Sequence, residues 1–443
     1  MKRPIIVAAV FLAAISLILL NVNYRLSILF AALFFSATVV CAFYKSFREC
    51  TVIAVCLLLL CLSFYNTYTA RINTCKNLYK DEATVTGVVT DSSYRYQDTV
   101  LYYVEITDST IPQAIGTTAL LYGYNLSAGQ GMTVKMDVRL SFIEDSYSFY
   151  SNDIYLKGYV DKVHSVKDLP SAKNFLGKLR KNIRNIIFKN LPYDIATTIN
   201  GLTVGDRSYE EDSFYAAVKN CGVTHVMVVS GMHMAIVCGS FYQLLKFLKC
   251  PSLVASLSTL AVTLAFMALC GFSPSVIRSG VMYIIMLVGY LLHRQPDALN
   301  SLSVAFVIMM INNPFLIYNV GFLLSVTSTA GIIILNPLLL KLIRIDKSKI
   351  KPLRIIAELA TVTISAQLAT LPICLYYFGW ISPWAILVNI LISHAVTVAV
   401  VSAFIGIILF AVPFFQPLSD LSFKICSFMT AYFNNIIMFF GKL

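Results

Sequence analysis

Several side chains capable of acid–base or nucleophilic chemistry lie close together in segment 201–237 of an otherwise apolar region. They are Asp206, Arg207, His225, Ser230 and His233. An ionisable group at membrane depth costs about 2.5 to 3.5 kcal/mol on insertion scales, so such groups usually line a bundle interior or a water-filled path. This segment is therefore the first candidate for a functional site.

Ser230 and His233 are three residues apart, so on a helix they share one face and could serve as a nucleophile and its base. However, Val228 occupies the first glycine position of a G-x-S-x-G elbow, and no acidic residue nearby in sequence could orient the histidine. In a channel the same groups would hydrogen-bond backbone phosphate, and Gly231 would permit close helix approach. A channel lining, a packed polar seam and an intramembrane serine hydrolase remain open.

Two further polar side chains fall inside apolar stretches. Arg278 follows Pro274 at the start of one stretch, and Gln367 precedes Pro372, which we expect to interrupt another. Irregular backbone at membrane depth survives only beside protein or a wet cavity, which favours a pore or transport path. Arg278 could contact a substrate, a backbone carbonyl or Asp206, and Gln367 could form an interhelical hydrogen bond instead of lining a pore.

The composition predicts a polytopic α-helical membrane protein. Hydrophobic residues make up 58% of the 443, charged residues make up 13%, and the mean hydropathy is +0.75. Cytoplasmic loops rich in Lys and Arg would account for the net charge of +12. We expect about eleven transmembrane helices, at 5–20, 26–43, 52–68, 224–245, 252–269, 276–292, 301–311, 317–340, 355–377, 385–410 and 414–440.

Basic residues predict the orientation of these spans in the cell membrane. Lys2 and Arg3 precede the first span, which has no small-residue cleavage site and is therefore expected to be retained. The loops holding Lys246 with Lys249, His293 with Arg294, and residues 341–354 fall on the same side as the N-terminus. The positive-inside rule makes that side the cytoplasm.

Residues 81–166 read as five short strands separated by Gly, Asn and Asp, which predicts a small β-barrel of the OB type inserted outside the cytoplasm. OB folds bind single strands through basic grooves and aromatic platforms, and this segment is rich in tyrosine. Its acidic residues outnumber Lys and Arg, however, so most of these tyrosines are expected to serve the barrel itself.

The segment after the barrel predicts an amphipathic helix at the membrane interface, with Lys178, Arg180, Lys181 and Arg184 among its basic residues. Its cations could meet lipid phosphate, or they could guide a polyanion towards the membrane. The expected domains are N-terminal helices over 1–72, the barrel over 80–166, this helix over 171–191 and a transmembrane channel domain over 194–443.

Cysteine spacing suggests no metal site, because the sequence has no C-x-x-C pair. Neither a metal nor a cofactor is predicted. Most cysteines lie in apolar spans, where they behave as small hydrophobic residues. Cys75 and Cys221 both fall near the expected outer face, but spacing alone cannot pair them.

Several sequence blocks together resemble the ComEC family of competence proteins. They are Gly205-Asp206-Arg207, His225 with Ser230-Gly231-Met232-His233, GFSPSVIR at 271–278, Asp297 with Asn300, Gly321-Phe322 with Ser325, and SAQLATLP at 365–372 followed by Phe378-Gly379. The resemblance covers the chain from about residue 195 to its end. It implies an inner-membrane channel, not an enzyme, that admits single-stranded DNA during natural transformation.

The resemblance also implies partners. These are membrane lipid, an external DNA receptor and a cytoplasmic helicase-like ATPase, since the sequence has no P-loop. Many family members carry a metallo-β-lactamase-like domain, whereas this sequence has no H-x-H-x-D-H run, so a separate nuclease would be needed. The sequence departs from the family's usual pattern at two positions: Leu323 stands where Gln is usual, and Asn313 stands where Asp is usual. A homo-oligomer stays open, as does a carrier of a small solute or envelope polymer, although no clear internal repeat supports a carrier.

Overall fold

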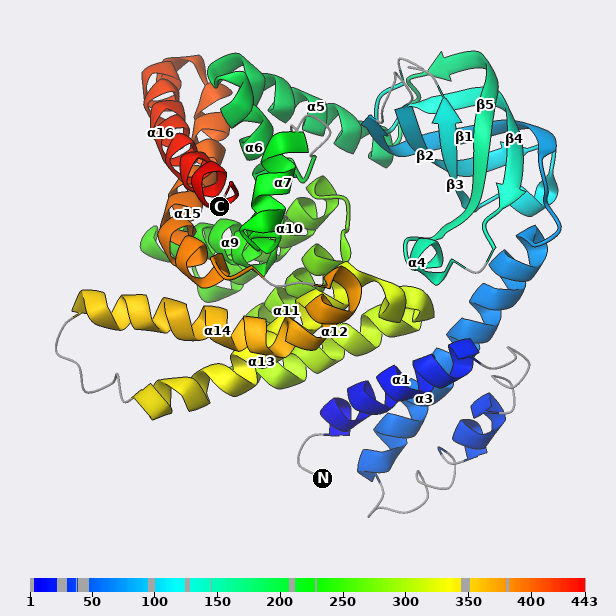
Figure 1. Cartoon of the computed structure of the whole chain (residues 1–443), viewed down its shortest axis with the longest axis horizontal. Helices are drawn as coiled ribbons and strands as arrows, with labels where there is room; N and C mark the ends of the chain where they lie inside the picture. Colours follow the sequence, from blue (N-terminus) through cyan, green and yellow to red (C-terminus); the bar gives the residue numbers. More distant parts are fainter. Residues whose placement is uncertain are drawn as a thin grey trace. The chain divides into compact units, whose positions relative to one another are not determined.

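The computed structural model describes residues 4–21, 30–36, 38, 48–94, 100–123, 128–144, 146–206, 212–227, 229–343, 351–379 and 382–442. The chain divides into two compact units (Figure 1). The N-terminal unit comprises Met1–Leu179 with Ser303–Asn319, and the C-terminal unit comprises Arg180–Leu302 with Val320–Leu443.

Apolar helices open the N-terminal unit. Helix α1 (Pro4–Asn21) packs against α3 (Arg48–Thr67), which continues as the π-helical segment η2 (Tyr68–Asn73). The last part of α12 (Ala298–Asn312) and the 3-10 helix η4 (Pro314–Tyr318) belong to the same unit, where the ring of Phe315 lies 5.8 Å from that of Phe64. Most of the predicted span 26–43 lies outside the described residues.

The predicted five-stranded barrel is confirmed. Its strands are β1 (Asp81–Tyr94), β2 (Val100–Ser109), β3 (Thr118–Gly123), β4 (Thr133–Phe142) and β5 (Ile154–Lys167). They close in the order β1-β2-β3-β5-β4, with β3 and β5 parallel and the other pairs antiparallel. In β4 alternate residues are buried, which is the period-2 pattern of a strand with one face in a core. Two short helices, η3 (Pro112–Ala114) and α4 (Tyr147–Tyr150), lie in the connections.

Helices build the C-terminal unit. Besides α5 (Ala172–Asn190), which joins the two units in sequence, they are α6 (Tyr193–Val204), α7 (Asp212–Asn220), α8 (Thr224–Met227), α9 (Gly231–Phe247), α10 (Ser252–Leu269), α11 (Pro274–Leu291), α13 (Val320–Ile343), α14 (Lys351–Phe378), α15 (Ala385–Phe410), η6 (Pro413–Phe415) and α16 (Gln416–Phe440). Helices α15 and α16 pack along each other (Figure 1). Gly331 of α13 lets α14 approach closely, because a Cβ atom there would lie 2.7 Å from the carbonyl oxygen of Ser365.

Seven described helices are long and apolar enough to cross a membrane, at Cys50–Asn73, Ser252–Leu269, Pro274–Leu291, Val320–Ile343, Ala357–Phe378, Ala385–Phe410 and Pro413–Phe440. The apolar stretches Ile5–Ser16 and Ala298–Asn312 are shorter. The protein is therefore helical, with several helices able to cross a membrane and an inserted barrel, and the predicted number of about eleven spans is not confirmed.

Two sequence predictions about helix continuity are wrong. The predicted span 224–245 is divided, because Ser230 has extended backbone angles (φ −127°, ψ 179°) and a new helix begins at Gly231. Pro372 was expected to interrupt its span, but α14 runs through it. A membrane helix tolerates an internal proline because neighbouring helices and local adjustments satisfy the freed backbone group.

Candidate functional site

Ser230 and His233 form the N-terminal cap of α9. The Ser230 side chain accepts from the backbone N–H of His233, and the backbone N–H of Ser230 donates to Nδ1 of His233 at 3.2 Å. The Ser230 hydroxyl also lies 3.2 Å from Nδ1. This reciprocal capping box satisfies donors that the first helical turn would otherwise leave unpaired. The close serine–histidine pair thus has a structural cause.

The cap fixes which nitrogen of His233 carries the proton. Nδ1 accepts a backbone N–H, so in the neutral ring the proton lies on Nε2. His233 is fully buried, and Nε2 has no hydrogen-bond partner among the residues that the structure describes. A buried donor without a partner is costly, which makes Nε2 a candidate contact for a ligand that accepts hydrogen bonds.

Arg278 lies on α11 and is only 7% exposed. Its Nε donates to the Ser325 hydroxyl at 2.8 Å, and Nη1 lies 3.6 Å from the sulfur of Met282. The Ser325 hydroxyl in turn donates to that of Ser275 at 3.3 Å. Within the described ranges no carboxylate forms an ion pair with Arg278. Among these residues the buried positive charge therefore has no counter-ion, which is costly unless an anion joins it.

The guanidinium of Arg278 lies beside the first residue of α9. A Cβ atom on Gly231 would be 3.4 Å from Nη2 of Arg278 and 3.5 Å from Cβ of Ser279, which is van der Waals contact, so the backbone of α9 lies directly against the guanidinium. The N-terminus of a helix carries about half a positive charge and free N–H groups. Two sources of positive potential thus meet at one buried place, which is the arrangement of an anion-binding site.

This geometry suits anion binding better than acyl transfer. A serine nucleophile needs a histidine whose second nitrogen is oriented by an acid. Here Nδ1 is shared with a backbone N–H, and no carboxylate bonds to Nε2 in the described part of the chain. The serine–histidine pair therefore does not support the hydrolase interpretation.

The structure gives Asp206 partners other than Arg278. Asp206, considered as its partner, instead lies 3.6 Å from Nη1 of Arg184. Its carbonyl accepts from the Asn200 side chain at 2.9 Å, just after Gly205, whose φ of 80° ends α6. Arg207 lies outside the described residues.

His225 and Gln367 stand apart from the Arg278 group. His225 belongs to the short helix α8, and its side chain forms a hydrogen bond with Asn389 of α15. Gln367 is half-buried in α14, and no hydrogen bond of its side chain is recorded among the described residues. Ser230 and His233 contact each other, and Gly231 adjoins Arg278. Their function remains a proposal.

The basic helix α5 is less free to meet a polyanion than its sequence predicted. Arg180 donates from Nε to the carbonyl of Leu269 at 2.5 Å and from Nη2 to that of Ala268 at 3.2 Å, so it caps the C-terminal end of α10. Lys178 lies 2.9 Å from Asp168, whereas Lys181 is exposed.

The apolar face of α5 was expected to lie in the membrane interface. In the C-terminal half of the helix, Ile183 and Ile187 instead lie in the protein core. Phe175 and Leu179, nearer its start, are exposed. The expected lipid-facing stripe is therefore wrong for the second half of the helix.

Ser325 and Ser275 are site residues that sequence reasoning did not assign. Both occurred in the blocks that carried the family resemblance, but hydroxyl groups on separate helices give no local signal of a shared partner. The structure unites three of these blocks around Arg278: the first turn of α9, the start of α11 and the start of α13.

Comparison with known proteins gives the family. A family model described as Competence protein matches residues 202–443, which is more than half of the chain. "ComE operon protein 3" of Bacillus subtilis (strain 168) is 28% identical over 232 residues, which cover 52% of this chain and 29% of that protein. The match thus spans less than a third of that relative's length. No solved structure matches the chain. The resemblance found in the sequence is confirmed, and the chain belongs to the competence protein family.

Proposed function

We propose that the chain forms a path through the cell membrane by which single-stranded DNA enters during natural transformation. Membership of the competence family and the apolar helices support this proposal. The observation that carries it is the buried guanidinium of Arg278, which has no carboxylate partner among the described residues and lies against the first turn of α9.

The proposed contact is with the DNA backbone. Each phosphodiester carries one negative charge, and the free donors of Arg278 and the Nε2–H of His233 can bind its oxygens. Contacts to phosphate position a strand but read no bases, which suits a path that must accept any sequence. The same groups would replace part of the water that the phosphate loses on entering the membrane.

The wider arrangement is part of the same proposal. The barrel would lie outside the cell membrane, a DNA receptor would deliver the strand, and a cytoplasmic helicase-like ATPase would supply the energy. A separate nuclease would remove the complementary strand where that is needed. Lys181 and the other exposed cations near the start of α5 would meet either lipid phosphate or the incoming strand.

The first prediction tests Arg278 by substitution. Arg278→Gln should lower the entry of labelled DNA by at least about tenfold per inserted molecule, because hydrogen bonds to charged groups are worth about 1.5 to 3 kcal/mol. Arg278→Lys, which keeps the charge but loses the planar fork, should retain part of the uptake. The exposed Arg294 provides the matched control, and Arg294→Gln should leave uptake unchanged.

Abundance in the membrane must be measured beside uptake. If Arg278 belongs only to a packing seam, Arg278→Gln will lower the amount of inserted protein while each remaining molecule imports DNA at the normal rate. That result would end the phosphate-contact assignment. Normal DNA entry after deletion of the whole gene would reject the transport function itself.

A further inference from the structure

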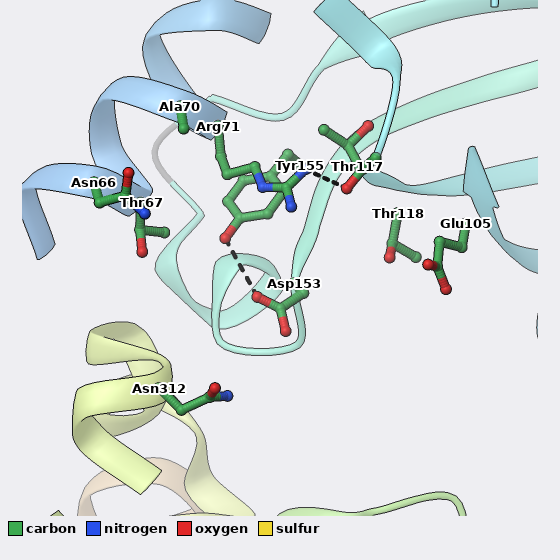
Figure 2. A pocket seen from close by; sticks show the side chains of 11 residues that line it. Asn66, Thr67, Ala70, Arg71, Glu105, Thr117, Thr118, Asp153, Tyr155 and Asn312 are labelled. Carbon is green, nitrogen blue, oxygen red and sulfur yellow. Dashed lines mark hydrogen bonds between the residues drawn. The ribbon is translucent and has the colours of Figure 1, made fainter. Parts of the chain in front are cut away.

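A polar pocket with a volume of about 400 Å³ lies within the N-terminal unit. Its walls come from the end of α3, from η2, from the barrel strands β2, β3 and β5 and from the end of α12. Figure 2 shows Tyr155 between Arg71 and Asp153, with Glu105, Thr118 and Asn66 further around the wall. Charged, hydroxyl and amide groups thus face one space that is large enough for a small polar ligand.

Opposite charges face this pocket and act on each other across it, but they form no ion pair among the described residues. Arg71 donates to the carbonyl of Gly116. Oδ1 of Asp153 accepts from the hydroxyl of Tyr155 at 3.4 Å and from the amide of Asn313 at 3.3 Å, whereas no bond to its Oδ2 is recorded in the described residues. No ion pair joins Arg71 to Asp153 in this part of the structure. A ligand with one anionic and one cationic end would satisfy both groups.

The carboxylates also restrict the ligand. Glu105 is paired with Lys173 at the edge of the pocket, so the formal charges of these four groups cancel. A purely anionic ligand would approach Arg71 but also meet Asp153, and a purely cationic ligand would meet Arg71. The charge pattern therefore favours a zwitterion over either.

The helix beneath the pocket is a candidate membrane span. The apolar span Cys50–Asn73 has 24 residues, and a bilayer core needs about 20. Arg71 lies near the end of this candidate span, and the end of a helix that crosses a membrane falls where the hydrocarbon gives way to lipid headgroups. Asn66 and Thr67 lie one turn deeper and line the pocket as well. The pocket is therefore placed where a headgroup could enter it from the bilayer.

We propose that this pocket binds the phosphoethanolamine headgroup of a membrane phospholipid, with the phosphate at Arg71 and the ammonium at Asp153. Guanidinium binds phosphate through charge-assisted hydrogen bonds, and the primary ammonium can donate to the free oxygen of the carboxylate. Phosphocholine has the same net charge but no N–H group, so it cannot make the second contact. The proposal stands independently of the proposed DNA path.

The second prediction is that the chain retains phosphatidylethanolamine in preference to phosphatidylcholine. It is tested with the full chain in lipid nanodiscs that contain equal amounts of the two lipids. Native mass spectrometry should find phosphatidylethanolamine enriched among retained lipids by about tenfold, as expected for a charge-assisted hydrogen bond. Stepwise N-methylation of the headgroup should remove this preference. Asp153→Asn and Arg71→Gln should each abolish it. Asp108→Asn, an exposed carboxylate of β2 that does not line the pocket, should leave it unchanged.

The other outcomes overturn the proposal. Equal retention of the two lipids by the unmodified chain would reject headgroup selection, and stronger retention of phosphatidylglycerol would show an anion site instead. If soluble glycerophosphoethanolamine binds while the lipid is not enriched, the ligand is a soluble zwitterion and not a phospholipid. Preserved enrichment in a folded Asp153→Asn chain would remove the ammonium contact.

Discussion

Asn313 shows why one atom can decide which residue a position requires. Its side-chain amide donates to the carbonyls of Tyr150 and Ser151 at 3.1 and 3.3 Å and to Asp153, while its oxygen accepts from the backbone N–H of Phe315 at 2.9 Å. In the family that the sequence resembles, aspartate is usual at this position. Aspartate could accept the Phe315 bond, but it could not donate to the carbonyls.

The third prediction follows from this difference between an amide, which can donate, and a carboxylate, which cannot. Asn313→Asp should destabilise the N-terminal unit by about 1 to 3 kcal/mol, because buried carbonyls lose their donor and a second carboxylate is placed beside Asp153. Thermal unfolding of the purified chain would measure the change. The exposed Asn77 allows the same chemical substitution away from this contact, and Asn77→Asp should have little effect. Equal stability of the two variants would contradict the role given to Asn313.

Single residues also mark the limit of sequence reasoning about the site. The sequence proposed Ser230, His233 and Arg278 as site residues, because polar groups in an apolar stretch are conspicuous. It could not find the partner of Arg278, which is Ser325 on another helix and not Asp206. For the same reason Arg180 read as a free cation, whereas it caps a helix far along the chain. Such pairings depend on tertiary packing, and the spacing of residues along the chain does not predict them.

Among the elements, three barrel strands meet at Asp137 of β4. The hydroxyl of Thr84 in β1 donates to Oδ1 at 2.7 Å, and Nε2 of His164 in β5 lies 2.7 Å from Oδ2. The Thr84 hydrogen bond, followed by that of His164, holds the pKa of Asp137 below its ordinary value of 3.8. A folded-state pKa that is lowered means that folding favours the ionised carboxylate.

The fourth prediction is that the stabilisation which ionised Asp137 gives the fold is lost in acid. This stabilisation is fully present above the pKa of the carboxyl in the unfolded chain, and it disappears as the pH falls through the lower pKa of the folded state. The thermal unfolding midpoint of Asp137→Asn should therefore lie below that of the unmodified chain at pH 6, and the two should converge as the pH drops below about 4. Asp161→Asn, which removes a different exposed carboxylate of β5, serves as the comparison. A difference that persists undiminished in strong acid would show that the ionised carboxylate is not responsible.

Helix and strand boundaries differed in how well the sequence predicted them. The five strands were found because alternating residues and turn-forming residues carry both the faces and the ends of a strand. The division between α8 and α9 was missed, because hydropathy stays high across it and only the cap at Ser230 reveals the new helix. The continuity of α14 through Pro372 was missed because its surroundings, not the proline alone, decide whether a helix survives.

At the scale of the whole molecule, whether α9 crosses the membrane decides on which sides the barrel and Gln295 lie. Its 17 residues would span about 26 Å at 1.5 Å per residue, slightly less than a bilayer core of about 30 Å. Between the barrel and Gln295, the described helices that are long and apolar enough to cross are α10 and α11. If only these two cross, the barrel and Gln295 lie on the same side, whereas a crossing by α9 places them on opposite sides.

The fifth prediction is that the barrel and Gln295 lie on opposite sides of the membrane. With α9 crossing, Lys246 at its end and Arg294 beyond α11 both fall on the side away from the barrel, as the positive-inside rule requires if the barrel is outside. In a chain whose native cysteines are replaced, a membrane-impermeant maleimide added to intact cells should label Asp108→Cys but reach Gln295→Cys only after the membrane is opened. Both positions are exposed on the protein, so a failure to label reports the membrane barrier and not burial. Labelling of both in intact cells would mean that α9 lies within one face of the membrane, and its first turn, with the Arg278 site, could not then be part of a continuous path across it.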